Sequence, residues 1–273
     1  MPLKEPKYKF NQTILKVFGV GPNKKIKVIT MRALRTAGLV DDDKHLGDGL
    51  GDGLKERVNT EKLEESISRT KSKIFEIAFC NPWDWFFTGT LDPAKYDRTD
   101  LDNYHKKLTQ WIRDYNKKYS IKIKFLFVPE LHNDGKSWHI HGFLYGLPVE
   151  HLKQFKVGDT MGKGLAYKVK KGDIVYNWLP YADKFGFCDL EPIRNHEAVS
   201  KYITKYISKN LATSVKELNA HQYYASRGLN RAETIKKGTM ITYVEPTYEN
   251  DYCRVTWLDY SDDLLAQLED SII

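Results

Sequence analysis

The stretch IKIKFLFVPELHNDGKSWHIHGFLY, residues 121–145, decides the fold because it contains two strand-like runs on either side of a turn. Aromatic and β-branched residues dominate both runs, as is typical of strands. Between them, Asn133-Asp134-Gly135 is a strong turn signal, because these residues adopt the backbone conformations of tight hairpin turns. The sequence therefore predicts a β-hairpin whose second arm carries His139 and His141.

The two histidines are candidate metal ligands. On a strand, residues i and i+2 share one face, so His139 and His141 project together while Ile140 faces the core. The predicted turn brings Glu130, on the first arm, back alongside them. Two imidazoles and one carboxylate suit Mg²⁺ or Mn²⁺ with open positions for phosphate oxygens, and they also accept Zn²⁺ or Ni²⁺. The competing interpretation is a merely polar face of a hairpin.

A second candidate site lies on a predicted helix at residues 197–209. Tyr202 and Tyr206 are four residues apart and share one helix face, and Lys201, Lys205 and Lys209 recur at the same interval. A phenol can attack phosphorus and hold a covalent phosphodiester, and a nearby cation stabilises the charge that develops. The competing interpretation is an amphipathic helix that packs its tyrosine rings.

Three motifs in order carry a resemblance to a known family. Residues 86–91 (FFTGTL) resemble its first motif, Glu130 with residues 139–141 (HIH) its metal motif, and residues 202–206 (YITKY) its nucleophile motif. Residues 58–212 or so thus resemble a rolling-circle replication initiator of the HUH endonuclease superfamily, of the two-tyrosine phage or plasmid type. Mobilisation relaxases place the tyrosine before the histidines, and related transposases are typically shorter with one tyrosine.

The resemblance implies a mechanism and a cofactor. A divalent metal ion, Mg²⁺ or Mn²⁺, would bind His139, His141 and Glu130 and polarise the scissile phosphate. One tyrosine would attack single-stranded origin DNA, giving a 5′-phosphotyrosyl enzyme and a 3′-OH that primes a polymerase. Lys205 is the candidate for charge stabilisation. The order in which Tyr202 and Tyr206 act stays open at this point.

DNA binding is expected at cations with interleaved aromatic rings, which grip unpaired strands. Lys168, Lys170 and Lys171 lie in a predicted glycine-bearing loop, residues 163–173, together with Tyr167. Lys201, Lys209 and Arg227 are further candidates. A solvated loop is an equal alternative for residues 163–173. A non-enzymatic DNA-binding replication regulator on the same fold is the alternative for the whole chain, whereas the glycine-aromatic run of an RNA-binding sheet is missing.

The periodicities predict an α+β fold with a central antiparallel sheet and helices packed on it, as in the ferredoxin-like or RRM-like fold that the resemblance implies. Helices are expected at residues 58–79 and 96–119, and strands at residues 85–91, 174–178 and 185–193, besides the hairpin. Three regions are predicted: an N-terminal accessory region at 1–56, the endonuclease domain at 57–212, and an extension at 213–273 packed on the catalytic domain.

Composition narrows the function further. The formal charge of +7 is compatible with a polyanionic partner, and three widely spaced cysteines predict no disulfide framework or zinc cluster. With neither a signal core nor an apolar run of ~18 residues, a cytoplasmic protein without a membrane partner is expected. The phosphate-binding pattern GxxxxGK[ST] is absent from the sequence, so unwinding would need a host helicase, alongside a host polymerase.

Overall fold

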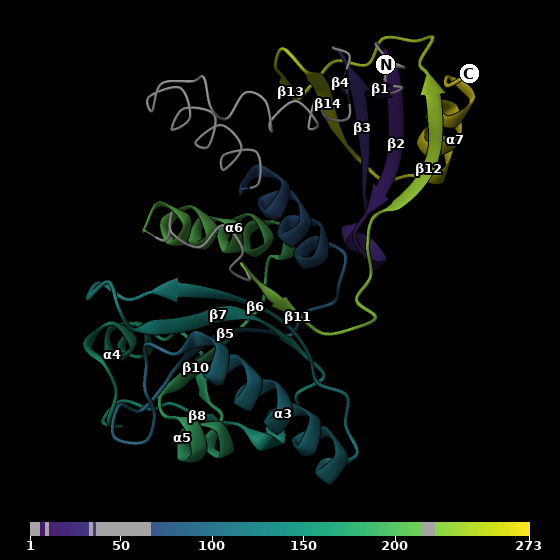
Figure 1. The fold of residues 1–273 in the computed structure, drawn as a ribbon. Coiled ribbons are helices and arrows are strands. Elements are labelled where there is room, and N and C mark those ends of the chain that lie inside the picture. Colours follow the sequence, from purple (N-terminus) through teal and green to yellow (C-terminus); the bar gives the residue numbers. More distant parts are fainter. Residues whose placement is uncertain (1–5, 9–10, 33–34, 37–66, 214–221) are drawn as a thin grey trace, which may run out of the picture. The chain divides into compact units, whose positions relative to one another are not determined.

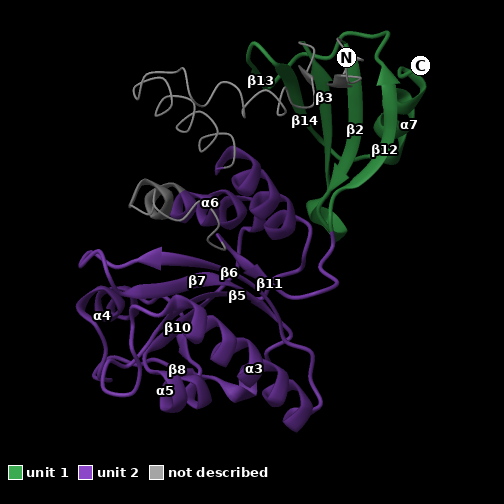
Figure 2. Ribbon diagram, viewed as in Figure 1, with its two compact units in different colours: residues 1–65, 231–273 green, residues 66–230 purple. Residues whose placement is uncertain are grey.

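A computed structural model describes the chain except for residues 1–5, 9–10, 33–34, 37–66 and 214–221. The chain divides into two compact units, residues 1–65 with 231–273 (unit 1) and residues 66–230 (unit 2), which Figure 2 colours separately. Each unit contains an antiparallel sheet with helical structure packed on it, so the predicted α+β class is confirmed. No helix in the described part of the chain is long and apolar enough to span a membrane.

Unit 2 is built on a seven-stranded sheet in the order β11-β6-β7-β5-β10-β9-β8, in which every pairing is antiparallel. The predicted hairpin forms two neighbouring interior strands of this sheet, β6 (Lys124–Leu131) and β7 (Trp138–Tyr145). The remaining strands are β5 (Trp85–Thr90), β8 (Lys153–Gln154), β9 (Tyr176–Asn177), β10 (Cys188–Pro192) and β11 (Tyr224–Ala225).

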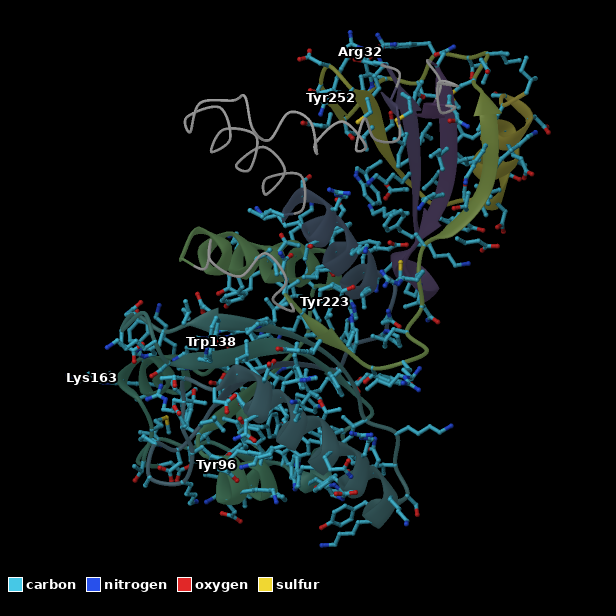
Figure 3. All side chains as sticks on the ribbon, in the orientation of Figure 1. Arg32, Tyr96, Trp138, Lys163, Tyr223 and Tyr252 are labelled. Atoms are coloured by element: carbon cyan, nitrogen blue, oxygen red, sulfur yellow. The ribbon has the colours of Figure 1, made fainter. Side chains whose placement is uncertain are left out.

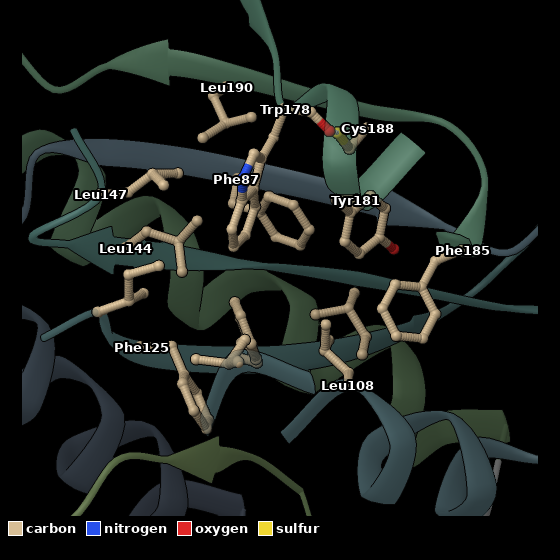
Figure 4. Packing of buried hydrophobic residues seen from close by; sticks show 14 of the residues in the cluster. Phe87, Leu108, Phe125, Leu144, Leu147, Trp178, Tyr181, Phe185, Cys188 and Leu190 are labelled. Carbon is tan, nitrogen blue, oxygen red and sulfur yellow. Dashed lines mark hydrogen bonds between the residues drawn. The ribbon is translucent and has the colours of Figure 1, made fainter. Parts of the chain in front are cut away.

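Helices cover both faces of this sheet (Figure 1). Helices α3 (Leu101–Tyr119) and α5 (Leu179–Phe185) lie on one side, and α6 (His196–Thr213) and the helical residues 67–79 lie on the other. The core between the sheet, α3 and α5 is rich in aromatic side chains, several of which Figure 4 shows interleaved around Phe87 and Trp178. Burying rings of this size supplies most of the stabilisation that such a core provides.

The first turn of α3 shows why the helix begins later than predicted. The sequence predicts a start at residue 96, but residues 97–99 form a turn in which the Asp97 carboxylate accepts hydrogen bonds from both the backbone N–H and the hydroxyl of Thr99. The Asp100 carboxylate then accepts from the Asn103 backbone N–H at 3.0 Å. An aspartate in this role satisfies one of the unpaired amides of the first turn, so it fixes the helix start.

Two predicted loops are helices in the structure. Residues 163–173, expected as a glycine-bearing loop, contain α4 (Lys163–Lys170), which buries Leu165 and Val169 against Phe155 and Val175. The segment around Pro180 joins the strands predicted at 174–178 and 185–193 and is therefore expected as a loop, but it is the first turn of α5. Proline is compatible with the first turn because the amide it lacks has no partner within the helix there. The strand expected at 174–178 is correspondingly short.

Unit 1 joins the two ends of the chain in one sheet, ordered β12-β2-β3-β14-β13. Helix α7 (Asp262–Asp270) packs Leu268 against Leu15, Ile26 and Val28 of that sheet. The division therefore differs from the predicted one, which placed residues 213–273 on the catalytic domain. The strands of unit 1 are β2 (Gln12–Phe18), β3 (Lys25–Met31), β12 (Glu233–Thr239), β13 (Tyr248–Glu249) and β14 (Cys253–Asp259), while β1 (Pro6–Tyr8) pairs separately with β4 (Arg35–Thr36).

The reason for this difference is strand pairing over long sequence separation. Strands β2 and β3 form a hairpin that leaves an unpaired edge on each side, and β12 and β14 occupy those edges. Sequence periodicity shows that a strand exists but does not show which edge it joins. Part of the N-terminal region, including the Gly-Asp repeat at residues 47–53 and the first part of the helix predicted at 58–79, lies outside the described residues.

Candidate active site

The candidate residues of the hairpin lie on the face of the unit 2 sheet that α6 covers. Glu130 is directly opposite His139 in the β6–β7 pairing, so the carboxylate and the imidazole project on the same face. Ile140, between the histidines, is fully buried on the other face. The structure therefore brings Glu130, His139 and His141 together in the manner that the hairpin predicts.

Two threonines of β5 contact the histidine rings through their hydroxyl groups. Thr90 pairs with His139 and Thr88 pairs with His141 across the β5–β7 ladder. The Thr90 hydroxyl lies 2.8 Å from His139 Nδ1, and the Thr88 hydroxyl lies 3.4 Å from His141 Nδ1. Both contacts engage Nδ1 and leave Nε2 as the nitrogen available to a ligand. The sequence motif at residues 86–91 contains both threonines, but only the β5–β7 pairing shows that they contact the histidines.

Glu130 and His141 form the closest contact of the set. His141 Nε2 lies 2.9 Å from a Glu130 carboxylate oxygen, and both side chains are largely buried. At this distance a proton or a cation must lie between the two atoms, since both otherwise present lone pairs. The pair is thus either a hydrogen bond from His141 Nε2–H to the carboxylate or two of the three ligands of a metal site.

His139 is electrostatically prepared to be a neutral ligand. Burial, reinforced by the neighbouring His132, His141 and Arg98, lowers its pKa to about 4. At neutral pH the ring therefore carries no charge, and a metal ion would not compete with a proton for its lone pair. His132 is exposed, and its ring stacks on that of His139 with centroids 4.7 Å apart.

The donor chemistry of these three residues fits a divalent metal ion, but they do not yet converge on one point. The rings of His139 and His141 are 6.2 Å apart, and within the described residues no group of three or more His, Cys, Asp or Glu side chains is placed to hold a metal. Two imidazoles and a carboxylate are nevertheless the ligand types of an open divalent site. The strand register places His139 directly opposite Glu130, so the two side chains project on the same face.

Helix α6 places both tyrosines against this face. The Tyr206 ring stacks on the His141 ring with centroids 4.2 Å apart and planes within 11°. The Tyr202 ring meets Phe86 edge to face, and the Tyr206 hydroxyl donates to the Tyr202 oxygen at 2.9 Å. Exposure distinguishes the two, since Tyr202 is 45% exposed and Tyr206 only 9%. Burial and the hydrogen bond to Tyr202 raise the pKa of Tyr206 far above its ordinary value.

The predicted lysines of α6 have different surroundings. Lys205 lies with its ammonium 5.4 Å from the centre of the Tyr202 ring, close to the candidate nucleophile. Lys201 forms an ion pair with Glu197 at 2.6 Å one turn earlier. Lys209 belongs to α6, but its side chain lies outside the described residues.

The candidate DNA-binding lysines of α4 and Arg227 also differ in their surroundings. Lys168 donates to Glu191 of β10 at 2.7 Å, and Glu191 raises the lysine's pKa although burial opposes this. Lys170 and Lys171 are exposed, and the Lys171 ammonium lies 4.6 Å from the centre of the exposed Tyr167 ring. Helix α4 begins at Lys163, which Figure 3 labels at the edge of unit 2. Arg227 is exposed after β11, at the sheet edge beyond β6.

Asp189 is a charged residue of this face that sequence reasoning missed. It pairs with Thr88 in the β10–β5 ladder, so its carboxylate and the Thr88 hydroxyl are neighbours on the same face. Burial and the neighbouring Glu191 raise its pKa to about 7, while Lys168 and Thr88 oppose this shift. Two acidic residues in a five-residue strand, Asp189 and Glu191, give no distinctive sequence signal, so only the strand register reveals the position of Asp189.

Comparison with known families covers the same part of the chain. Residues 84–211 match a family model. The family is described as replication-associated protein ORF2/G2P. The match begins one residue before β5 and ends within α6, so it contains both histidines, Glu130 and both tyrosines. It supports a replication initiator. No match was found among curated proteins or among solved structures.

Proposed function

We propose that the protein initiates rolling-circle replication by nicking and rejoining single-stranded origin DNA through a 5′-phosphotyrosine. The observation that carries the proposal is the stacking of a two-tyrosine helix on His141, beside Glu130, inside the segment that matches the ORF2/G2P family. Such a site contains a nucleophile, a candidate metal-binding set and cations within one partly buried face. These are the parts that transesterification at a phosphodiester requires.

In the proposed reaction, a tyrosine oxygen attacks phosphorus and the bond from phosphorus to the 3′ oxygen breaks. The phenolic proton is lost and the leaving 3′ oxygen gains a proton, so the free 3′-OH can prime a polymerase. A divalent ion, Mg²⁺ or Mn²⁺, held by His139, His141 and Glu130 would supply charge stabilisation at the phosphate. Attack by the second tyrosine or by a returning 3′-OH would rejoin the strand without an external energy source.

Tyr202 is proposed as the first nucleophile. Its side chain is 45% exposed and accessible to a strand, whereas Tyr206 is covered and has a raised pKa. The Tyr206 hydroxyl donates to the Tyr202 oxygen, and such a bond strengthens as negative charge develops on the acceptor. The Lys205 ammonium near the Tyr202 ring adds a positive charge at the same place.

The strand is proposed to cross exposed cations on either side of the tyrosines. Lys168, Lys170 and Lys171 of α4 and its C-terminal end, with the Tyr167 ring, offer phosphate contacts and a stacking surface. Lys201, Lys209 and Arg227 are proposed as further phosphate contacts. Lys168 would have to exchange Glu191 for phosphate, so its contribution is expected to be smaller than that of Lys171.

The proposal is tested by incubating the full chain with a library of single-stranded origins and Mn²⁺ or Mg²⁺, followed by mass spectrometry of the peptide–DNA adduct. The parent is expected to form an adduct on Tyr202. Tyr202→Phe should lose first-strand cleavage, whereas Tyr206→Phe should retain it at a lower rate. Tyr145→Phe, another partly exposed tyrosine of unit 2, is the matched control and should behave as the parent.

The alternative function, a non-enzymatic DNA-binding regulator, makes the opposite prediction. It is favoured by the basic composition and by the exposed lysine and tyrosine side chains of α4. Tight binding of single-stranded DNA without any adduct, unchanged in the double variant Tyr202→Phe with Tyr206→Phe, would establish that alternative.

A further inference from the structure

Three polar side chains form a row across three neighbouring strands of the unit 2 sheet. Asp189 of β10 is opposite Thr88 of β5, and Thr88 is opposite His141 of β7. Directly opposite residues of antiparallel strands project on the same face, so the three side chains are neighbours. The Thr88 hydroxyl lies 3.4 Å from His141 Nδ1, and on its other side it is near enough to the Asp189 carboxylate to lower the pKa of that group.

We infer that Asp189 is a positioning residue for His141 and acts through the Thr88 hydroxyl. A histidine that binds a cation through Nε2 must carry its hydrogen on Nδ1. That hydrogen can be donated to Thr88 Oγ1, whose own hydrogen is then donated to the Asp189 carboxylate. With a cation on Nε2, the row therefore favours the ring tautomer and orientation in which Nε2 binds that cation beside Glu130. This inference rests on the proposed metal site of the proposed function.

Burying the Asp189 carboxylate costs free energy, and the fold alone does not explain why a carboxylate lies at this position. Asp189 is partly buried on this strand, between the buried Cys188 and Leu190, and removal from water disfavours its charged form. The neighbouring Lys168 offsets part of this cost, although its ammonium is bonded to Glu191. A neutral residue would avoid the cost altogether, whereas a hydrogen-bond relay to a metal ligand requires a strong acceptor at its end.

The comparison with His139 shows that the two histidines are supported differently. The Thr90 hydroxyl lies 2.8 Å from His139 Nδ1, and the backbone N–H of Thr90 donates to the carbonyl of Phe187, the residue before β10. Next to His141, by contrast, the row continues from Thr88 to the Asp189 carboxylate. This difference provides a matched control, because Thr90→Val removes a threonine contact of the same kind from the other histidine.

The first experiment measures Mn²⁺ binding to the full chain by calorimetry without DNA. Thr88→Val and Asp189→Asn are each expected to weaken binding, by about 10-fold for Thr88→Val as is common for groups behind a ligand. Asp189→Asn should weaken Mn²⁺ binding less than Thr88→Val does, since the amide oxygen of asparagine can still accept a hydrogen bond from Thr88. The double variant should bind no more weakly than Thr88→Val alone, whereas Asp189→Asn with Thr90→Val should show multiplied losses.

The second experiment records histidine ring ¹⁵N spectra of the metal-free chain, which report the His141 contact independently of metal or catalysis. Thr88→Val and Asp189→Asn should shift the His141 Nδ1 signal and leave His139 unchanged, while Thr90→Val should do the reverse. Multiplied losses in the Thr88→Val, Asp189→Asn pair, or an unshifted His141 signal, would overturn the inference. If the parent binds no Mn²⁺, the proposed metal site fails and the ring spectra alone decide the function of Asp189.

Discussion

Gly142, next to His141, lets strands β6 and β7 of unit 2 approach closely. A Cβ atom at this position would lie 2.0 Å from the Leu126 carbonyl oxygen, which belongs to the backbone of β6 and cannot turn away. The strands that carry Glu130 and His141 would have to separate. The glycine therefore sets the spacing of the candidate site as well as that of the sheet.

Gly142→Ala is expected to reduce the free energy of unfolding by about 3 kcal/mol, since overpacking against backbone costs this much in other cores. Urea denaturation followed by circular dichroism measures the change. Gly164→Ala is the control, because a Cβ there meets no atom within 4 Å and alanine favours the helix. Equal stability of the Gly142→Ala variant and the parent would contradict the close approach of β6 and β7.

Asp189 should make stability depend on pH. Its folded pKa of about 7 lies above the ~3.9 of an unfolded aspartate, so the folded state binds more protons between these values. Its contribution to stability is therefore present below pH 4 and is lost as pH rises towards 7. Relative to the parent, Asp189→Asn should gain stability by roughly 2–4 kcal/mol over this range, measured as urea unfolding at several pH values. A pH-independent difference would contradict the shifted pKa.

At the scale of the element, α3 ends at a residue in the left-handed conformation. Ser120 follows the helix with φ of 54° and ψ of 38°, and its N–H donates to the Asn116 carbonyl. Glycine adopts this conformation without the steric cost that a Cβ brings. Ser120→Gly should therefore raise the free energy of unfolding by about 1 kcal/mol. Ser120→Ala, which keeps the Cβ, should show no such gain in the same denaturation experiment.

Helices α6 and α4 show where the sequence predicts the structure correctly and where it does not. The four-residue spacing of Tyr202 and Tyr206 predicts a shared helix face, and the structure shows their hydroxyls 2.9 Å apart. For residues 163–173, glycines and lysines suggested a loop, yet Leu165 and Val169 reach a small core at helical spacing. The loop prediction gave more weight to the polar residues than to the two apolar ones. In the structure, burial of Leu165 and Val169 against Phe155 and Val175 stabilises a helix instead.

At the scale of the whole molecule, the two units differ in how the chain builds them. Unit 2 is continuous, and Asn81 closes it by bonding the Asn230 backbone at both N–H and carbonyl. Unit 1 needs both ends of the chain, since β12 and β14 flank the β2–β3 hairpin. A two-stranded hairpin by itself is marginally stable in water.

A chain that ends after Asn230 is accordingly expected to keep unit 2 folded and to lose unit 1. Amide hydrogen exchange should retain protection in β5, β6 and β7 and lose it in β2 and β3, by at least 100-fold. The full chain is the reference for both sets of amides. Protection of β2 and β3 without residues 231–273 would contradict a sheet that depends on the C-terminal strands.

The sequence alone determined the features that depend on short-range periodicity. The hairpin, the common face of His139 and His141, and the tyrosine spacing follow from two-residue and four-residue repeats that local backbone geometry dictates. Tertiary structure decided what those faces meet: Thr88 and Asp189 behind His141, Tyr206 on its ring, and β12 and β14 beside the N-terminal hairpin. Pairing between distant segments depends on the burial and hydrogen bonding of the whole sheet, which local patterns do not encode.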